Sequence, residues 1–384
     1  MKYKLGEICE IISGSTPKTS IAEYWDGDIK WITPAELTDD SYIINDSARK
    51  LTELGVKKTG LTSFPAGTVI LSSRAPIGKV AIAGCEMYCN QGFKNLICSD
   101  KINNKYLYWF LKCNTVFLNS LGRGATFKEI SKSIVGDIEI NVPDEAEQEK
   151  AVRNLEKLSE IIKLRKKEIE ELDNLIKARF VEMFGDPIEN PMGWNTKPLL
   201  SLGKCKNGMN FHYDEEGVTI NCLGVGEFKD NSIISDTGSL PVITLNEMPS
   251  DEYLLKNDDI VFVRSNGNKA LVGRSVAVYP GEIPTTFSGF CIRYRIDDHA
   301  ITVPYLLRVL KSESVRKKMA GRGANIQNLN QQTLGTVTVP IPPMDLQMQF
   351  SNFMAQTDKS KVAVQKGLDK AKLLFDSLMQ KYFG

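Results

Sequence analysis

The sequence DEAEQEKAVRNLEKLSEIIKLRKKEIEELDNLIKARFVEMFG, residues 144–185, lies near the midpoint of the 384-residue chain. Apolar residues recur in it every seven positions, and most of the other positions hold Lys, Arg or Glu. This pattern predicts one continuous helix with a narrow apolar seam that needs another helix to cover it. At about 1.5 Å per residue such a helix is roughly 60 Å long, too long for the interior of one domain. The seam is predicted at Leu155, Ile162, Ile169 and Ile176.

The covering helix is predicted in the same chain, because residues 305–384 align with residues 106–185 without a gap. The tetrapeptide Gly-Arg-Gly-Ala occurs at 122–125 and again at 321–324. So long a register predicts two copies of one unit, each a globular part followed by a long helix. Lys361 stands where an apolar residue is expected, which predicts a weak point in the pairing. The seam of the second helix is predicted at Leu368, Phe375 and Tyr382.

The repeat divides the chain into four segments. The central helix ends at Gly185-Asp186-Pro187, because glycine favours helix ends and proline cannot continue a helix. In the globular parts, β-rich runs alternate with polar loops, and an aromatic helix is predicted from Lys105 to Leu118. This indicates an α+β fold with mixed or antiparallel strands. The predicted segments are a first globular domain at 1–143, a central helix at 144–185, a second globular domain at 186–342 and a C-terminal helix at 343–384.

Each globular part contains two β-rich runs joined by a polar, hairpin-like loop. The runs are Thr68–Leu71 and Lys79–Ala83 in the first copy, and Asp259–Arg264 and Leu271–Val278 in the second. After the hairpin, Gln91-Gly92-Phe93 in the first copy is matched to Ser288-Gly289-Phe290 in the second. Residues 208–249 show little likeness to their counterpart, so the front halves of the two copies diverge while the carboxyl halves stay in register.

The composition, with 42% apolar and 25% charged residues, is that of a soluble globular protein. The net charge of +1 does not indicate a nucleic-acid binder, but basic residues concentrate at 94–132 and 308–322. Such runs also fit an ordinary solvated helix face. No apolar run approaches the roughly 18 residues of a membrane span, and the amino terminus lacks the apolar core of a signal peptide. A cytoplasmic protein with no membrane partner is therefore expected.

Residue types that carry catalysis or bind metals are poorly represented. The eight cysteines contain no Cys-x-x-Cys pair and predict free thiols in a reducing compartment, and the two histidines do not predict a zinc site. Ile341-Pro342-Pro343-Met344 is not the Asn/Asp-Pro-Pro-aromatic motif of DNA amino-methyltransferases. Pro143-Asp144-Glu145 begins a helix instead of a nuclease strand, and Gly78-Lys79-Val80 lacks the glycine spacing of a phosphate-binding loop. A binding protein is favoured over an enzyme.

The polar loops hold the candidate binding residues. Arg and Lys suit guanine edges, Asn and Gln suit adenine edges, and flanking Lys, Ser or Thr can hold phosphates. An ordinary polar hairpin is the alternative for the two strand-joining loops. Arg123 and Arg322, in equivalent glycine loops, fit either phosphate contacts or helix capping. The candidate DNA-binding residues are Arg74, Lys79, Gln91, Lys94, Arg123, Arg264, Asn266, Asn268, Lys269, Arg274 and Arg322.

Several segments together resemble the specificity (S) subunits of type I restriction-modification systems, and the likeness covers essentially the whole chain. The first copy contributes KLGEICEIISGSTPK, YWDGDIKWIT, VILSSRAPIGKVAI and NQGFK, and the junction between copies contributes FGDPIENPMGW. The second copy contributes DIVFVRSNGNKALVGRSVAV and GRGANIQNLNQQTLGTVTVPIPP. The opening of the second globular part, PLLSLGKCKNGMNFHYDEEG, departs from the pattern because it lacks the Gly-Ser-Thr-Pro loop of the first.

The resemblance implies two target recognition domains, each reading one half of a bipartite sequence in double-stranded DNA. The two long helices would pair as an antiparallel coiled coil with pseudo-twofold symmetry. The family's S subunit has no active site and binds no cofactor. Two methyltransferase subunits bring S-adenosylmethionine and modify adenine, and restriction (translocase) subunits use ATP with Mg.

Three other readings stay open at this point. The chain could serve a related methyltransferase or nuclease system without separate ATP-driven restriction subunits. It could be an enzyme of unusual motif, which methylation by the purified chain with a methyl donor would reveal. It could also be a repeat scaffold that binds only protein, which would show no salt-dependent affinity for duplex DNA.

Overall fold

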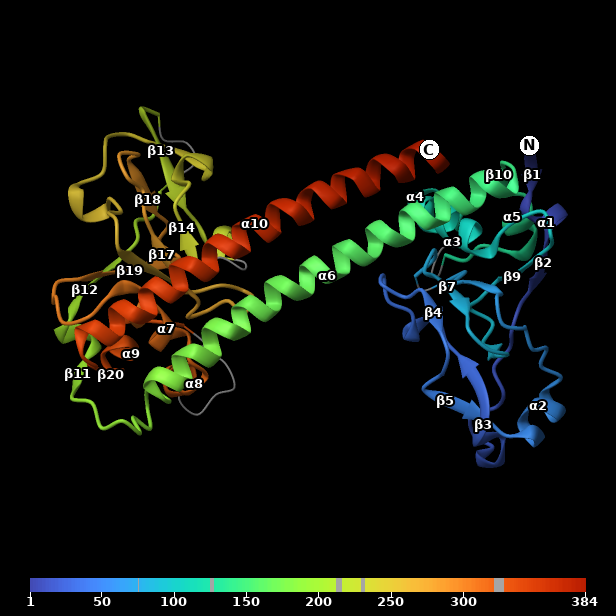
Figure 1. The fold of residues 1–384 in the computed structure, drawn as a ribbon, viewed down its shortest axis with the longest axis horizontal. Coiled ribbons are helices and arrows are strands. Elements are labelled where there is room, and N and C mark those ends of the chain that lie inside the picture. Colours follow the sequence, from blue (N-terminus) through green and yellow to red (C-terminus); the bar gives the residue numbers. More distant parts are fainter. Residues whose placement is uncertain (75, 125–127, 212–215, 229–231, 321–327) are drawn as a thin grey trace. The chain divides into compact units, whose positions relative to one another are not determined.

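The computed structural model divides into two compact units (Figure 1). Unit 1 comprises residues 1–167 and 365–384, and unit 2 comprises residues 168–364. Each unit therefore contains one globular part and a portion of both long helices. The structure describes residues 1–74, 76–124, 128–211, 216–228, 232–320 and 328–384. The second Gly-Arg-Gly-Ala tetrapeptide and its Arg322 lie outside these described residues.

The described residues of unit 1 form three sheets. The strands are β1 (Lys2–Lys4), β2 (Cys9–Ile12), β3 (Trp25–Ile32), β4 (Ile43–Ile44), β5 (Arg49–Leu51), β6 (Val69–Leu71), β7 (Val80–Ala83), β8 (Tyr88–Cys89), β9 (Asn95–Cys98) and β10 (Glu139–Asn141). A five-stranded sheet has the order β2-β9-β6-β7-β4, a three-stranded sheet has the order β5-β3-β8, and β1 pairs with β10. The β4–β7 and β3–β8 pairs are parallel and the others are antiparallel. The helices are α1 (Leu5–Ile8), α2 (Glu53–Thr59), α3 (Asn104–Cys113), α4 (Thr115–Ser120), α5 (Lys132–Gly136) and the first part of α6 (Glu145–Phe184).

Unit 2 repeats this topology pair by pair. The strands are β11 (Thr196–Pro198), β12 (Gly203–Asn207), β13 (Val218–Leu223), β14 (Ile233–Ile234), β15 (Val242–Leu245), β16 (Asp259–Val263), β17 (Ser275–Val278), β18 (Thr285–Phe287), β19 (Cys291–Ile296) and β20 (Thr338–Pro340). The sheet orders are β12-β19-β16-β17-β14, β15-β13-β18 and β11-β20, with parallel pairing again only at β14–β17 and β13–β18. The helices are α7 (Val303–Lys311), α8 (Glu313–Ala320), α9 (Gln331–Gly335) and α10 (Met344–Phe383). The divergent front halves therefore share one fold.

The five-stranded sheet of each unit is buried on both faces. In β6, Val69 and Leu71 belong to the core shared with α3 and the long helices, while Ile70 faces the core under the three-stranded sheet. Strand β16 alternates in the same way, with Ile260 and Phe262 on one side and Val261 on the other. Because successive side chains of a strand point to opposite faces, continuous apolar runs at these positions predict strands covered on both sides.

Two elements differ from the sequence-based prediction. The aromatic helix predicted from Lys105 to Leu118 breaks at Asn114, whose backbone is non-helical at φ −95° and ψ 22° and whose side-chain amide donates to the Phe110 carbonyl at 2.9 Å. The strand predicted from Leu271 starts only at Ser275, because residues before it form turns, with the Leu271 amide donating to Asn268. Side-chain and backbone hydrogen bonds of this kind compete with regular structure.

Both ends of α6 are capped by the residues that the sequence places there. Asp144 Oδ1 accepts a hydrogen bond from the Glu147 amide at 2.8 Å, which satisfies an amide at the start of the helix. Gly185 has φ +72° and donates to the Val181 carbonyl at 2.8 Å, as is typical of a left-handed residue that ends a helix.

Within unit 1 the start of α6 packs against the end of α10. Leu155 is fully buried in the same core as Met379, with Phe375 and Tyr382 half-buried against it. The Asn154 side-chain amide donates to the Tyr382 hydroxyl at 3.1 Å. Because the beginning of one helix lies beside the end of the other, the two segments run antiparallel.

Within unit 2 the end of α6 packs against the start of α10. Phe180 and Phe350 lie with ring centroids 5.5 Å apart, and Ile176 is buried in the same core. Of the remaining predicted seam residues, Leu368 of unit 1 is buried, whereas Ile162 of unit 1 and Ile169 of unit 2 are half-buried. Lys361 does not leave a gap in the seam, because its ammonium lies 2.5 Å from Asp173 Oδ1 on the other helix and replaces an apolar contact by an ion pair.

Candidate nucleic-acid interface

The hairpin loop of unit 1 is closed by Ser72. Its hydroxyl donates to the Pro76 carbonyl at 2.7 Å and accepts from the Lys79 amide at 2.9 Å, and Gly78 turns the chain with φ +94°. Serine and glycine in this spacing therefore shape a tight polar loop at the end of β6. The next residues, Ser73 and Arg74, leave the sheet toward two other segments.

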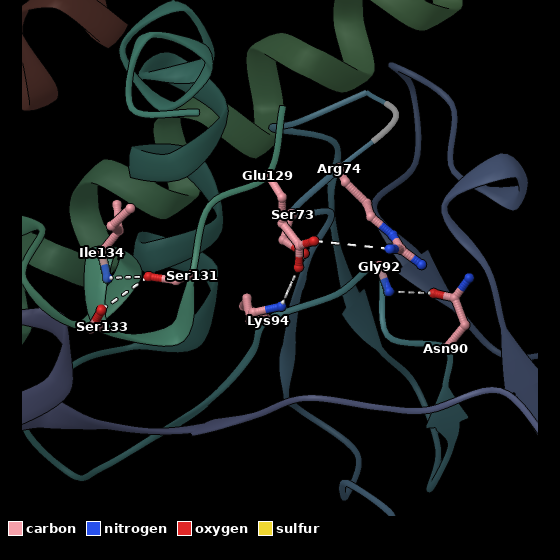
Figure 2. A network of polar contacts seen from close by, with 9 residues as sticks. All are labelled: Ser73, Arg74, Asn90, Gly92, Lys94, Glu129, Ser131, Ser133 and Ile134. Atoms are coloured by element: carbon pink, nitrogen blue, oxygen red, sulfur yellow. Dashed lines mark hydrogen bonds and ion pairs between the residues drawn. The ribbon is translucent and has the colours of Figure 1, made fainter. Parts of the chain in front are cut away.

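Three chain segments meet at the end of β6, in a region that we call the unit 1 junction (Figure 2). The Ser73 amide donates to the Gly92 carbonyl at 2.7 Å, and the Ser73 carbonyl accepts from Ile130 at 3.0 Å. Arg123 and Glu129 exchange two backbone hydrogen bonds of 3.0 Å. The junction comprises Ser73, Arg74, Gly92, Lys94, Arg123 and Glu129.

The side chains of Lys94 and Arg74 converge on the Glu129 carboxylate, as Figure 2 shows. Lys94 Nζ lies 3.1 Å from Glu129 Oε1 and 3.3 Å from the Ser73 hydroxyl, and the Lys94 side chain is only 8% exposed. Arg74 Nη1 lies 3.9 Å from Glu129 Oε2. Burying an ammonium group costs folding free energy unless an anion and hydrogen-bond acceptors compensate its charge. Glu129 therefore stabilises the nearly buried Lys94.

Two other predicted residues of unit 1 lie outside this charge network. Gln91 is exposed, and its Oε1 accepts from the Thr16 hydroxyl at 2.5 Å, which ties the Gly-Ser-Thr-Pro loop to the segment before Lys94. Lys79 points elsewhere, because its Nζ donates to the Leu37 carbonyl at 2.5 Å. Lys79 thus stabilises the fold in this structure, whereas the side chains of Arg74 and Lys94 meet at Glu129. Arg123 reaches Glu129 through its backbone.

Among the described residues, the unit 2 junction repeats the two backbone hydrogen bonds that Ser73 makes in unit 1. The Arg264 amide donates to the Phe290 carbonyl at 2.7 Å, and the Arg264 carbonyl accepts from Leu329 at 2.8 Å. Arg264 therefore occupies the position of Ser73, and Phe290 occupies the position of Gly92. The sequence match of Gly289 to Gly92 is wrong by one residue, because the strand pairing, and not the Gly-Phe dipeptide, fixes the register.

The side chains of the unit 2 junction differ in kind from those of unit 1. The same register places Ile292 where unit 1 has Lys94 and Asn328 where unit 1 has Glu129. Arg264 Nη1 makes one long hydrogen bond of 3.4 Å to the Gly289 carbonyl, and the Phe290 side chain is 62% exposed. The unit 2 junction comprises Arg264, Phe290, Ile292, Asn328 and Leu329.

The loop beyond Arg264 uses its asparagines locally. Asn266 Oδ1 accepts from the Asn268 amide at 2.8 Å, and Asn268 Oδ1 accepts from the Ala270 amide at 3.1 Å. Such turns hold the loop backbone in place. Lys269 is exposed at the loop tip, and Arg274 is half-buried at the loop exit, in the position that Lys79 holds in unit 1.

Glu129 is the residue of the junction that sequence reasoning missed. It is an acid in a basic segment, and residue type alone does not mark an acid as a DNA-binding candidate. The ungapped alignment of the two copies pairs Glu129 with Asn328, but neighbouring charged residues such as Lys128 and Lys132 also align with uncharged ones, so this change alone does not mark the residue.

The cysteines of the described chain are free thiols, and several are buried. Burial raises the pKa of Cys89 and of Cys222 to about 12, which keeps these thiols protonated and unreactive. The described residues hold no group of three or more His, Cys, Asp or Glu side chains that could bind a metal ion. No helix among the described residues is long and apolar enough to cross a membrane.

The duplicated fold, with two junctions that share a backbone and differ in side chains, defines a two-part binding protein. Comparison with known proteins gives the family. Residues 1–174 and 191–371 match the model of the type I restriction modification DNA specificity domain. The chain belongs to this family of type I restriction-modification specificity proteins.

Curated relatives span nearly the whole chain. It is 30% identical over 406 residues to the type I restriction enzyme MjaIX specificity subunit of Methanocaldococcus jannaschii, which covers 98% of this chain and 91% of that protein. It is 24% identical over 339 residues to the StySPI specificity subunit of Salmonella potsdam, with 81% and 72% covered. The crystal structure of the S subunit of a type I system from M. genitalium has the same fold, with a TM-score of 0.61 and 18% identity over 100% of this chain and 96% of that one.

Proposed function

We propose that each unit of this chain reads one half of a bipartite DNA target through its junction and the adjoining loop. The observation that carries the proposal is the pair of junctions: Ser73 in one unit and Arg264 in the other make equivalent backbone hydrogen bonds, but the side chains around these two residues differ. A shared frame with different polar groups suits two related surfaces that must recognise different base sequences.

The residues divide by the DNA groups that they suit. Arg74 and Arg264 carry guanidinium groups that match the O6 and N7 acceptors of guanine. Lys269 and Arg123 are exposed and suit phosphate oxygens. A cation that contacts phosphate adds binding energy that does not depend on the base sequence. Asn266 and Asn268 support the loop that presents these cations.

The chain itself supplies recognition and no catalytic step. Two methyltransferase subunits would bring S-adenosylmethionine and transfer the methyl group to adenine, and restriction subunits would use ATP with Mg. The alternative is a system with methyltransferase subunits but without separate ATP-driven restriction subunits. In both systems this chain would recognise DNA in the same way.

The test is co-expression of the full chain with the methyltransferase subunit of its own system, followed by genome-wide mapping of methylated adenines. The expected result is one bipartite motif that is absent when the chain is omitted. A complex that methylates no split motif would contradict the proposal. A purified complex whose affinity for duplex DNA does not fall as salt rises would instead support a scaffold that binds only protein.

A further inference from the structure

We propose that Glu129 is a base-reading residue of unit 1, accepting a hydrogen bond from the exocyclic amino group of a cytosine or adenine in the major groove. The inference rests on the proposed reading of DNA by the junctions, and it names a specificity-determining residue and its ligand chemistry. Glutamate is an established partner for the cytosine N4 amine, and the adenine N6 amine presents the same donor.

The position of Glu129 is fixed before any ligand arrives. Its amide and carbonyl both bond to Arg123, and its neighbour Ile130 donates to Ser73, so the backbone is held on two sides. Its side chain is held by Lys94, which is itself nearly buried and bonded to Ser73. A reader that is held in place in this way loses little conformational freedom on binding.

One oxygen of the carboxylate keeps its acceptor capacity. Oε1 accepts from Lys94 at 3.1 Å, whereas Oε2 has Arg74 Nη1 at 3.9 Å, beyond hydrogen-bond distance. The Glu129 side chain is 39% exposed, so solvent or a ligand can reach it. The hydrogen bond from Lys94 to Oε1 thus orients the carboxylate. The other oxygen, Oε2, has no donor within hydrogen-bond distance among the described residues and can accept a hydrogen bond from a ligand.

The charge of the cluster allows a carboxylate to approach DNA. Two cations, Lys94 and Arg74, lie at the one carboxylate, so the junction keeps a net positive charge that attracts phosphates. An ionised carboxylate only accepts hydrogen bonds, so it favours an amino group and is repelled by the O6 and N7 acceptors of guanine and the O4 of thymine.

The simpler alternative is that Glu129 only neutralises the nearly buried Lys94. Unit 2 offers the means to separate the two roles, because its junction fills the same two positions without charge, using Ile292 and Asn328. Transplanting this pair into unit 1 removes the charged pair as a whole and leaves no unpaired ammonium. A purely neutralising Glu129 would then become dispensable.

The experiment uses the full chain in complex with its methyltransferase and measures the methylated motif and binding to a set of duplexes that vary each base of both half-sites. The variants are Glu129→Gln and the double variant Lys94→Ile with Glu129→Asn. The matched control is Glu139→Gln, which neutralises an exposed glutamate of unit 1 that pairs with Lys2 on a separate sheet. Circular dichroism checks that each variant is folded.

The expected result is that both junction variants lose roughly 10-fold or more of the discrimination at one base pair of one half-site, as for a single base-edge contact. The other half-site stays as in the wild type, and Glu139→Gln changes neither. If the wild type reads a split motif but the folded double variant discriminates as the wild type does, Glu129 is not a reader. A wild type without any split motif would overturn the proposed function instead.

Discussion

The two junctions can be compared position by position because the strands around them pair in the same way. In both, a residue just beyond the central strand bonds to one segment through its amide and to a second through its carbonyl. The paired positions are Ser73 and Arg264, Gly92 and Phe290, Lys94 and Ile292, and Glu129 and Asn328. The backbone frame is therefore kept while the side chains that a ligand would meet change, which separates folding from recognition.

The helices α3 and α7 also occupy equivalent positions in the two units while differing in their side chains. In unit 1, Trp109 of α3 lies edge-on to Phe375 of α10, with ring centroids 5.6 Å apart. The alignment of the copies pairs Trp109 with Arg308 of α7, whose Nε has no hydrogen-bond partner among the described residues. Burial lowers the pKa of Arg308 and of the neighbouring Lys311. Unit 2 thus accepts charge where unit 1 uses aromatic packing.

Replacing Glu129 by Ala should produce the largest loss of stability at the junctions. The nearly buried Lys94 would lose its counter-ion, and because the Glu129 side chain is partly exposed the cost should be about 1–3 kcal/mol, below that of a fully buried pair. The exposed Asn328 at the equivalent position of unit 2 should tolerate Ala at a cost below about 0.5 kcal/mol. Urea unfolding of both variants measures the difference, and equal effects would show that the two junctions do not differ as described.

Lys311→Met should stabilise unit 2 near neutral pH. Burial, with repulsion from Arg308, lowers the pKa of Lys311 from its ordinary value of 10.5 to about 8. A protonated lysine is therefore disfavoured in the folded state below that pH, and the penalty disappears as the pH rises toward the unfolded value. The expected gain is about 1–3 kcal/mol at pH 7, decreasing above about pH 8 and vanishing only above pH 10.5.

Denaturant unfolding of the Lys311 variant and the wild type between pH 6.5 and 10 provides the measurement. The comparison is Lys112→Met at the aligned position of unit 1, where burial also lowers the pKa but Nζ donates to the Asp39 carbonyl at 2.8 Å and to the Tyr108 hydroxyl at 2.9 Å. Lys311 donates to the Ser232 hydroxyl at 2.8 Å, so the Lys112 variant loses one more hydrogen bond and should show the smaller gain. A gain at Lys311 that does not change with pH would contradict the electrostatic explanation.

Arg264→Ala should affect recognition more than stability. The hydrogen bond that its guanidinium makes among the described residues is long, at 3.4 Å, so little folding energy depends on it. On the proposed function, the half-site read by unit 2 should lose about 1–2 kcal/mol of discrimination, while the other half-site stays unchanged. Binding to duplexes with single-base changes tests this, and an equal loss at both half-sites would argue against separate readers.

Arg123→Ala should give the smallest change. An exposed phosphate contact contributes similarly for every base sequence, so affinity should fall slightly and the slope of log affinity against log salt should decrease by about one. Lys2→Ala, which removes an exposed lysine paired with Glu139 away from the junction, should leave the slope unaltered. Binding titrations at several salt concentrations measure the slope for each variant. An unchanged slope for Arg123→Ala would favour a helix-capping role over a phosphate contact.

The sequence was informative where its patterns are periodic or repeated. The seven-residue spacing predicted α6, and the gapless alignment predicted α10 and the duplication. Both signals are local or tied to a fixed register, so no knowledge of long-range contacts was needed. The shared topology of the front halves could not be predicted, because strands such as β3 and β13 keep their pairing while their sequences diverge.

The junctions were only partly predictable for a related reason. Cations in polar loops could be selected by type, but their grouping depends on contacts such as Lys94 with Glu129, which lie 35 residues apart. The ion pair of Lys361 with Asp173 joins residues 188 apart and turns an expected weak point into a polar contact. Sequence spacing alone carries no information about which distant charges meet.

The most direct test replaces residues 186–342 by the corresponding segment of a specificity protein with a known, different motif, keeping both long helices. Methylated adenines are then mapped with the same methyltransferase subunit present. If each unit reads independently, one half of the bipartite motif changes to that of the donor and the other half remains. A motif that is unchanged, or altered in both halves, would contradict the account.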